Sequence, residues 1–359
     1  AVAERGEHSG LVVLYDSSSL RKKKVLHYPD LGSKYYTCIA FSDDGRQCLT
    51  QGAGPEWNLV LWSIEKTVKV IAVTKVVPNE DIVVNQISFC PWDSTLSVVI
   101  GKGFVKLIRI IDGVFKLTNI ALRRENANFT SHCWLPDDIL ILGTEGGEII
   151  LVENNEYRGV IYPSNNGAGA ANSTGYSGIG IGRSGVGGDT SQLGPEELTP
   201  IYCFCPTSRG FVAGTVDGEV RIFERSTETR ELYALNEKQF LPKQLGKVLA
   251  LVLGSDDTLV AASDQQQLYS INLSSLHQSK GIDSDDEKEK VIFETLSSNF
   301  HGPNIRGEAS ITGIDIALWR QIVATTGKDR TIRLWNMSEK KQESVHYFDE
   351  EPTSVALHP

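Results

Sequence analysis

The 359-residue sequence lacks a long apolar run and is poor in positive charge, and both shortages restrict what it can do. Its best apolar stretch, Val248–Leu253, has the length of a β-strand, well short of the roughly 20 residues that span a bilayer. The 35 Lys and Arg residues are outnumbered by 45 Asp and Glu, for a net charge of −10. No membrane segment is therefore expected, and a nucleic-acid partner bound through its phosphates is disfavoured.

Motifs for metal binding and catalysis are also missing. The six cysteines include no Cys-x-x-Cys pair, and the seven histidines include no His-x-x-x-His pair. Neither Gly-x-Ser-x-Gly nor His-Glu-x-x-His occurs. We therefore predict no catalytic residue, no metal site and no cofactor, with reduced, buried thiols in a cytosol-like compartment.

An internal repeat is the strongest positive feature. Gly143–Glu153 aligns with Gly214–Glu224, and the same skeleton returns one residue shorter as Gly327–Asn336. Each copy is a tight turn followed by a strand with alternating apolar residues. The ends of such strands mark seven units, at Asp16, Ser63, Asp112, Glu153, Glu224, Asn272 and Asn336.

Each unit contains further short β-rich runs, which makes about four strands per unit with essentially no helical periodicity between them. Units of 40–50 residues with four strands each are typical of a β-propeller. We therefore predict an all-β fold, a seven-bladed β-propeller that occupies residues 1–359 as a single domain. Two insertions interrupt it, a flexible glycine-rich segment at 164–196 and a solvated acidic loop at 279–290.

The two chain ends resemble parts of one unit. Ala1–Glu4 resembles a second strand and Thr353–His358 a first strand, so we expect them to pair and close the propeller. Because residue 1 is not Met and already lies in an expected strand, we interpret the sequence as a fragment of a longer chain.

Gly327–Asn336 resembles the end of a WD repeat, with Asn336 in place of the terminal Asp. The other copies are degenerate, since Trp occurs at this position only as Trp62 and Trp335, and no Gly-His dipeptide is present. Beyond the repeat, the chain resembles the cilia- and flagella-associated protein 57 family, axonemal proteins with tandem WD-repeat propellers and a long coiled coil. The segments that carry this resemblance are Leu20–Leu26, Ala40–Gly45, Pro55–Trp62, His132–Glu153 and Ser354–Pro359.

The family resemblance implies a non-catalytic scaffold in the cytoplasm and cytoskeleton, at the axoneme of the cilium or flagellum. Its implied role is to anchor inner-arm dyneins and their regulators on doublet microtubules, with other proteins as its partners. Two alternatives stay open. One is a substrate- or peptide-recognition module of the ubiquitin-ligase or reader type, and the other is a propeller enzyme with its site at the central channel.

Arg21, Lys22, Lys23 and Lys24 form the one basic cluster of this acidic chain. Lysines at the edge of a sheet discourage aggregation, which is one interpretation. The other is a patch for an acidic partner, with tubulin as the obvious candidate in an axoneme.

Glu56 and Trp57 lie in a loop between two expected strands, where an aromatic side chain can serve as a binding anchor or pack back on the sheet. Both interpretations are kept. For Trp92 and Trp319, next to turns, packing is favoured.

Asp329 and Trp335 belong to the best-conforming repeat copy and are assigned structural roles in its turn and strand. His132 lies on an alternating strand and is expected to be a core residue with satisfied hydrogen bonds. Gly180–Gly185 matches a dinucleotide-binding pattern and Asp283–Glu294 a calcium-loop pattern, but neither is flanked by helical sequence, so both are interpreted as loops.

Overall fold

The computed structural model describes 12 stretches of the chain, which are residues 1–54, 56–77, 82–122, 126–161, 198–226, 232–242, 246–279, 293–297, 301–302, 310–317, 320–339 and 341–357. The glycine-rich insertion, Gly180–Gly185, Trp319 and residues 280–290 of the acidic insertion lie outside them. The chain divides into two compact units, residues 1–213 with 222–237 and residues 214–221 with 238–359. Organisation as a single domain stays a prediction.

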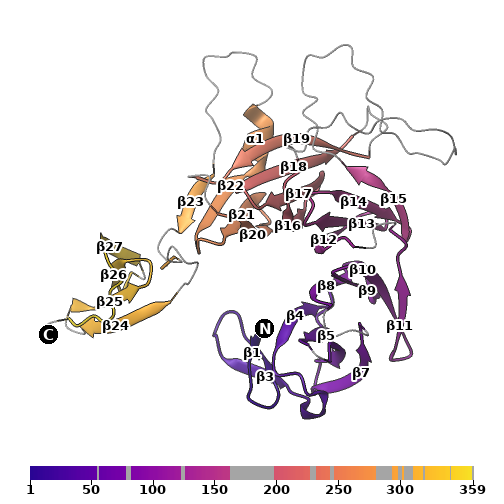
Figure 1. The fold of residues 1–359 in the computed structure, drawn as a ribbon, viewed down its shortest axis with the longest axis horizontal. Helices are drawn as coiled ribbons and strands as arrows, with labels where there is room; N and C mark the ends of the chain where they lie inside the picture. The colour runs from indigo at the N-terminus through magenta and orange to yellow at the C-terminus, as the bar shows by residue number, and fades with distance from the viewer. Residues whose placement is uncertain are drawn as a thin grey trace. The chain divides into compact units, whose positions relative to one another are not determined.

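The described residues form seven antiparallel sheets that follow one another along the chain, as predicted (Figure 1). The first has three strands, β1 (Val2–Glu4), β2 (Leu11–Tyr15) and β3 (Lys22–Leu26), and is followed by a 3-10 turn at Pro29–Leu31. The next three sheets have four strands each: β4 (Tyr36–Phe41), β5 (Gln47–Gly52), β6 (Asn58–Ser63) and β7 (Lys69–Lys75); β8 (Val84–Cys90), β9 (Asp93–Gly101), β10 (Phe104–Ile111) and β11 (Val114–Asn119); β12 (Phe129–Leu135), β13 (Ile139–Thr144), β14 (Ile149–Glu153) and β15 (Glu156–Ile161).

The last three sheets also have four strands each. They are β16 (Ile201–Pro206), β17 (Gly210–Thr215), β18 (Glu219–Arg225) and β19 (Tyr233–Phe240); β20 (Val248–Leu253), β21 (Thr258–Ser263), β22 (Leu268–Asn272) and β23 (Glu294–Ser297); β24 (Ile311–Ala317), β25 (Ile322–Gly327), β26 (Thr331–Asn336) and β27 (Lys341–Tyr347). In each sheet, neighbours in sequence are neighbours in space. Most of them are joined by short turns, whereas the connection from β22 to β23 is longer and contains a helix.

One short helix, α1 (Leu273–Ser279), was not expected from the sequence. It begins directly after β22, where the side-chain oxygen of Asn272 accepts a hydrogen bond from the backbone N–H of Ser275 at 3.1 Å. Asn is a strong residue at the start of a helix because its side chain satisfies one of the free N–H groups there. Asn272 therefore ends a strand and caps a helix at once.

In the unit formed mainly by residues 1–213, alternate residues of a strand face two different neighbouring sheets. In β13, Leu140 and Leu142 pack with the third sheet, whereas Ile139 and Ile141 pack with the fifth. In β9, Val99 likewise packs towards the second sheet, on the side opposite its neighbours along the strand. Because both faces are covered, the middle strands read as continuous apolar runs, and each buried side chain contributes about 1.5–3 kcal/mol.

A β-bulge recurs near the start of the first strand of a sheet, and it leaves the second residue of that strand out of the ladder. It occurs in β4, β8, β12, β20 and β24. The freed side chain can then bond the first strand of the next sheet: Asn85 donates to the carbonyl of Phe129 at 2.8 Å, and Thr130 donates to that of Ile201. The bulge thus links successive sheets through hydrogen bonds.

The same contact is found at the C-terminal end. Thr312, the second residue of β24, donates to the carbonyl of Pro352 at 2.6 Å, and Asp315 accepts from the backbone N–H of Leu357. Residues 352–357 thus lie beside β24 as a first strand would, while the first sheet has only three strands. No strand is assigned to them, and β1 pairs only with β2 among the described residues, so pairing of the chain ends stays a prediction. Cysteines placed in β1 and in 353–357 should form a disulfide if the pair exists, and failure in every register would exclude it.

Candidate functional site

Asp329 lies in the turn that joins β25 to β26, where Arg330 has a left-handed backbone (φ 61°). Its Oδ1 accepts hydrogen bonds from the backbone N–H of Thr331 at 3.3 Å and from the hydroxyl of that residue at 2.8 Å. Its Oδ2 accepts from the backbone N–H of Gly302 at 3.0 Å and from Nη2 of Arg333 at 3.3 Å. One carboxylate thus ties its own turn to a segment 27 residues earlier.

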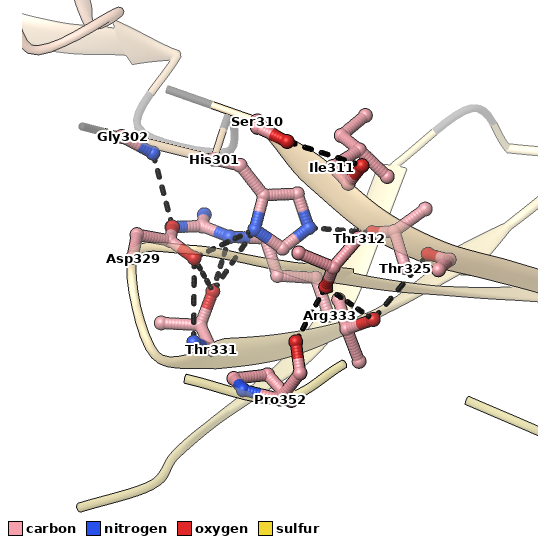
Figure 2. Close-up of polar contacts among 12 residues, drawn as sticks. His301, Gly302, Ser310, Ile311, Thr312, Thr325, Asp329, Thr331, Arg333 and Pro352 are labelled. Carbon is pink, nitrogen blue, oxygen red and sulfur yellow. Dashed lines mark hydrogen bonds and ion pairs between the residues drawn. The ribbon is translucent and has the colours of Figure 1, made fainter. Parts of the chain in front are cut away.

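His301 connects this carboxylate to the interior of the sheet, as Figure 2 shows. Its Nδ1 lies 2.9 Å from Oδ1 of Asp329, and its Nε2 lies 2.8 Å from Oγ1 of Thr325. Thr325 in turn accepts a hydrogen bond from the indole N–H of Trp335 at 2.7 Å. Because the ionised carboxylate of Asp329 can only accept, the proton of a neutral His301 is on Nδ1, and Nε2 then accepts from the hydroxyl of Thr325.

Burial alone would raise the pKa of Asp329, but hydrogen bonds from His301, Thr331 and the Gly302 backbone outweigh it and hold this pKa below its ordinary value. A carboxylate with a lowered pKa is more strongly stabilised in the folded than in the unfolded chain. The network therefore contributes its full stability above the pKa of an unfolded Asp and loses it as the pH falls through the folded pKa.

The order Thr325, His301, Asp329 matches the order of groups in nucleophilic triads, but its setting differs. Thr325 is 7% exposed and His301 is 6% exposed. The Thr325 oxygen also accepts a hydrogen bond from the indole N–H of Trp335, which engages one of its lone pairs. The arrangement suits a structural role, in which the hydrogen bonds hold the hairpin of β25 and β26 in place. In the described stretches, no group of His, Cys, Asp and Glu is placed to hold a metal ion.

The basic cluster divides into two parts. Lys23 forms an ion pair with Asp16 at 3.3 Å, and Lys24 donates to the carbonyls of Ile64 and Glu65, directly after β6 of the next sheet. Hydrogen bonds from Ser19 and from Lys23 lower the pKa of Asp16 to about 2. Arg21 and Lys22 are exposed, and their side chains make no ion pair or hydrogen bond within the described part of the chain.

Trp57 and Glu56 separate in the structure. Trp57 is 6% exposed and belongs to the core shared by the second and third sheets, with Leu59 and Val76 among its neighbours. Glu56 is exposed and lies 3.5 Å from Nζ of Lys75. This geometry supports the interpretation in which Trp57 packs back on the sheet.

His132 is buried, with 3% exposure, but it is only half satisfied. One ring nitrogen lies 2.6 Å from the hydroxyl of Ser88, and Nδ1 has no partner among the residues described. The expectation of a satisfied core histidine is therefore wrong for Nδ1. Burial lowers the pKa of His132 to about 3, so the ring is neutral at physiological pH.

Sequence reasoning missed His301 and Thr325. It searched for the dipeptide Gly-His, which is absent. This chain has the reverse order, His301-Gly302, and His301 lies 28 residues before Asp329. For Thr325 a signal was available: it lies two residues before the glycine that ends β25, just as Thr50 precedes Gly52 in β5. Thr50 accepts from the indole N–H of Trp62 at 2.8 Å, so the Thr–Trp pair recurs in the second sheet.

Comparison with known proteins supports the repeat. Residues 296–336 match the family model described as WD domain, G-beta repeat, and this range contains His301, Thr325, Asp329 and Trp335. By structure, the chain is similar to the crystal structure of the Cps50 (Swd1) β-propeller domain of Myceliophteria thermophila. The TM-score is 0.56 at 15% identity, with 92% of each chain covered. This likeness shows the β-propeller fold.

Among curated proteins, the chain is similar along its whole length to mouse cilia- and flagella-associated protein 57, at 30% identity. It is also similar to cilia- and flagella-associated protein 57 A of Tetrahymena thermophila, at 23% identity over 94% of this chain. The chain spans 29% of the mouse relative and 24% of the Tetrahymena one. Among the described residues, no helix has the length and apolar character to cross a membrane. The chain is thus an all-β, seven-bladed WD-repeat β-propeller, homologous to cilia- and flagella-associated protein 57.

Proposed function

We propose that this chain is a non-catalytic protein-interaction scaffold of the ciliary and flagellar axoneme. It helps to assemble or anchor inner-arm dyneins and their regulators on doublet microtubules. The observation that carries this proposal is the 30% identity, over the whole of this chain, to a mouse protein whose name associates it with cilia and flagella. The cytoskeleton of the cilium is then its location, and other proteins are its partners.

The fold supports a scaffold on physical grounds. Successive sheets share apolar cores and cross-sheet hydrogen bonds, so the hairpin turns at their ends are held on a rigid frame. Loops on a rigid frame bind partners with a small loss of conformational entropy. The polar network around His301 is buried, which favours a structural over a catalytic role for it.

Arg21 and Lys22 are the part of the basic cluster that we propose for an acidic partner such as tubulin. Their charges are not committed to ion pairs within the described stretches, unlike that of Lys23. Exposed charges of this kind chiefly steer association and respond to salt. The edge-protection interpretation predicts no effect of these residues on partner binding.

Co-sedimentation of the purified chain with salt-washed axonemal doublets tests the scaffold, with and without the extracted dynein arms added back. We expect the chain to pellet with doublets, and more of it to pellet when the extract is restored. A chain that stays in the supernatant under both conditions would overturn the proposal.

The same assay separates the two interpretations of the basic pair. Arg21→Glu with Lys22→Glu should weaken pelleting by about threefold to tenfold at low salt if the pair contacts an acidic partner. Lys66→Glu with Lys69→Glu is the matched control, because it reverses two charges at exposed positions of the neighbouring sheet. If both variants pellet with doublets as well as the unchanged chain does, edge protection is left as the role of the pair.

A further inference from the structure

Trp92 is a large aromatic side chain held on the surface. It lies in the turn between β8 and β9 and is 48% exposed, whereas Trp62 and Trp134 are 1% and 7% exposed. Packing was the sequence-based expectation for Trp92, and it holds only in part, because the ring packs edge-on against Trp134 while the residue stays 48% exposed. An exposed Trp is costly in water and is enriched where proteins bind one another.

Two contacts fix the orientation of this ring. Its indole N–H donates to Oδ1 of Asp138, in the turn between β12 and β13, at 2.9 Å. Its plane meets the ring of Trp134 edge-on, with centroids 6.4 Å apart and an interplanar angle of 80°. Trp134 is itself anchored by a 2.9 Å hydrogen bond from its indole N–H to Ser88. The side chain of Trp92 is therefore already ordered, and a partner that binds its open face does not have to immobilise it.

Three carboxylates lie in or next to the turns that hold Trp92 and Asp138, and one of them has no counter-charge. Asp93 pairs with Arg109 at 2.5 Å, and Asp137 pairs with Arg225 at 2.9 Å. Within the described stretches, Asp138 forms no ion pair, and its second oxygen accepts no hydrogen bond.

Two further observations place and orient these carboxylates. Asp93 begins β9 directly after Trp92, and Asp138 accepts the hydrogen bond of the Trp92 indole, so both carboxylates lie next to this ring. Asp137 and Asp138 both have left-handed backbones, with φ of 67° and 55°. A tight turn therefore fixes the position of the unpaired carboxylate.

We propose that Trp92 and Asp138 form a binding site for an arginine side chain of a partner protein. The guanidinium stacks on the open face of Trp92 and donates to the free oxygen of Asp138. Arginine fits better than lysine because its planar cation stacks on an aromatic ring and hydrogen-bonds a carboxylate in one geometry. The uncompensated negative charge disfavours an anionic ligand at the same place.

This site rests on the proposed role as an interaction scaffold and gives that role a point of contact. All its residues lie in the unit formed mainly by residues 1–213. It is separate from the basic pair, since Arg21 and Lys22 lie at the start of β3 in the first sheet and would take an acidic partner.

Fluorine NMR on the chain labelled with 5-fluorotryptophan tests the site. The Trp92→Phe variant assigns the Trp92 signal. The probes are the blocked peptides (Gly-Arg)4, (Gly-Lys)4 and (Gly-Glu)4. We expect (Gly-Arg)4 to shift the Trp92 signal saturably, (Gly-Lys)4 to bind at least about threefold more weakly and (Gly-Glu)4 to leave it unchanged. No shift with (Gly-Arg)4, or an equal affinity for (Gly-Lys)4, would overturn the arginine assignment.

A matched pair of substitutions distinguishes the site from general electrostatics. Asp138→Asn keeps an oxygen to accept the indole proton but removes the charge, and should weaken (Gly-Arg)4 binding by about tenfold. Asp137→Asn removes the same charge from the neighbouring residue, which already pairs with Arg225, and should change binding less than about twofold. An equal loss in both variants would overturn the proposal.

The scaffold proposal and the arginine-site proposal can be rejected independently of each other. The NMR titration uses the purified chain and does not depend on an axonemal role, while the doublet assay does not depend on Trp92. Pelleting without an arginine-induced shift would reject this site and keep the scaffold, and the reverse result would reject the axonemal role alone.

Discussion

The fourth sheet (β12–β15) and the seventh sheet (β24–β27) share one hairpin skeleton but are stabilised in different ways. In β13 and β14 the strand interiors are apolar and almost fully buried, from Ile139 to Leu142 and from Ile149 to Val152. In the seventh sheet, Ala324 is the one buried hydrophobic residue in its described part. Apart from Gly327, the other buried residues there are polar, namely Thr325, Thr326, Thr331 and Arg333.

The difference shows that one repeat can be held by two kinds of interaction. Apolar burial is spread over many contacts, so it is insensitive to pH and to the loss of any one polar partner. A buried hydrogen-bond network depends on each member, because removal of one leaves the others unsatisfied. We therefore expect the fourth sheet to respond to changes in side-chain volume and the seventh to changes in polarity and pH.

The largest effect is expected from a cavity in the fourth sheet. Ile141 is fully buried and packs between the fourth and fifth sheets. Ile141→Ala should lower the free energy of unfolding by about 4 kcal/mol, and the milder Ile141→Val by about 1 kcal/mol, as measured by urea denaturation. A loss below about 1 kcal/mol for the Ala variant would show that this core does not hold the sheet.

A slightly smaller loss is expected when the polar network of the seventh sheet is cut. Asp329→Ala leaves His301, Thr331 and the Gly302 backbone without their acceptor and should cost about 2–3 kcal/mol. Asp217→Ala is the matched control, since Asp217 occupies the same turn of the repeat but is exposed. If the two variants have the same melting temperature, the seventh sheet does not depend on the Asp329 network and the contrast between the sheets is wrong.

Acid should weaken the seventh sheet selectively. Because the folded pKa of Asp329 is lowered, its contribution is fully present above the unfolded pKa of about 4 and is lost as the pH falls through the folded pKa. The gap in unfolding free energy between the wild type and Asp329→Asn should therefore be widest near neutral pH and should narrow in acid. A gap that stays constant from pH 7 to pH 3 would contradict this charge assignment.

The smallest effect is expected from the indole hydrogen bonds. Trp335→Phe removes the donor to Thr325 and keeps most of the ring, so it should cost about 1 kcal/mol. Trp62→Phe removes the equivalent bond to Thr50 in the second sheet, where Trp62 is more deeply buried, and should cost at least as much. If only Trp335→Phe destabilises the chain, the bond matters through its link to His301 and not by itself.

The strand pattern could be predicted because it is encoded locally. The seven markers chosen for strand ends fall on or within one residue of a strand end, for example Glu153 at the end of β14 and Asp112 directly after β10. The seven sheets follow from this alternation and from the turn residues between strands. The helix at Leu273–Ser279 escaped because it is too short to show a helical period.

The candidate site was predictable only in part. Asp329 and Trp335 were assigned to the turn and strand that they occupy, because they lie within one hairpin. His301 was not, because its partners are 24 and 28 residues away and no local pattern marks it. The burial of Trp57 and the exposure of Trp92 depend on which neighbouring sheet covers each ring.

The sequence by itself determined the repeat, the number of sheets and the antiparallel order of strands within each, because hairpins are made by residues close together in the chain. Only the tertiary structure decided which side chains are exposed, which carboxylates find a cation and which carboxylate, Asp138, is left beside an open aromatic ring. The physical reason is that burial and charge pairing arise between sheets, from residues some 40 to 90 positions apart, as with Trp92 and Asp138 or Asp137 and Arg225.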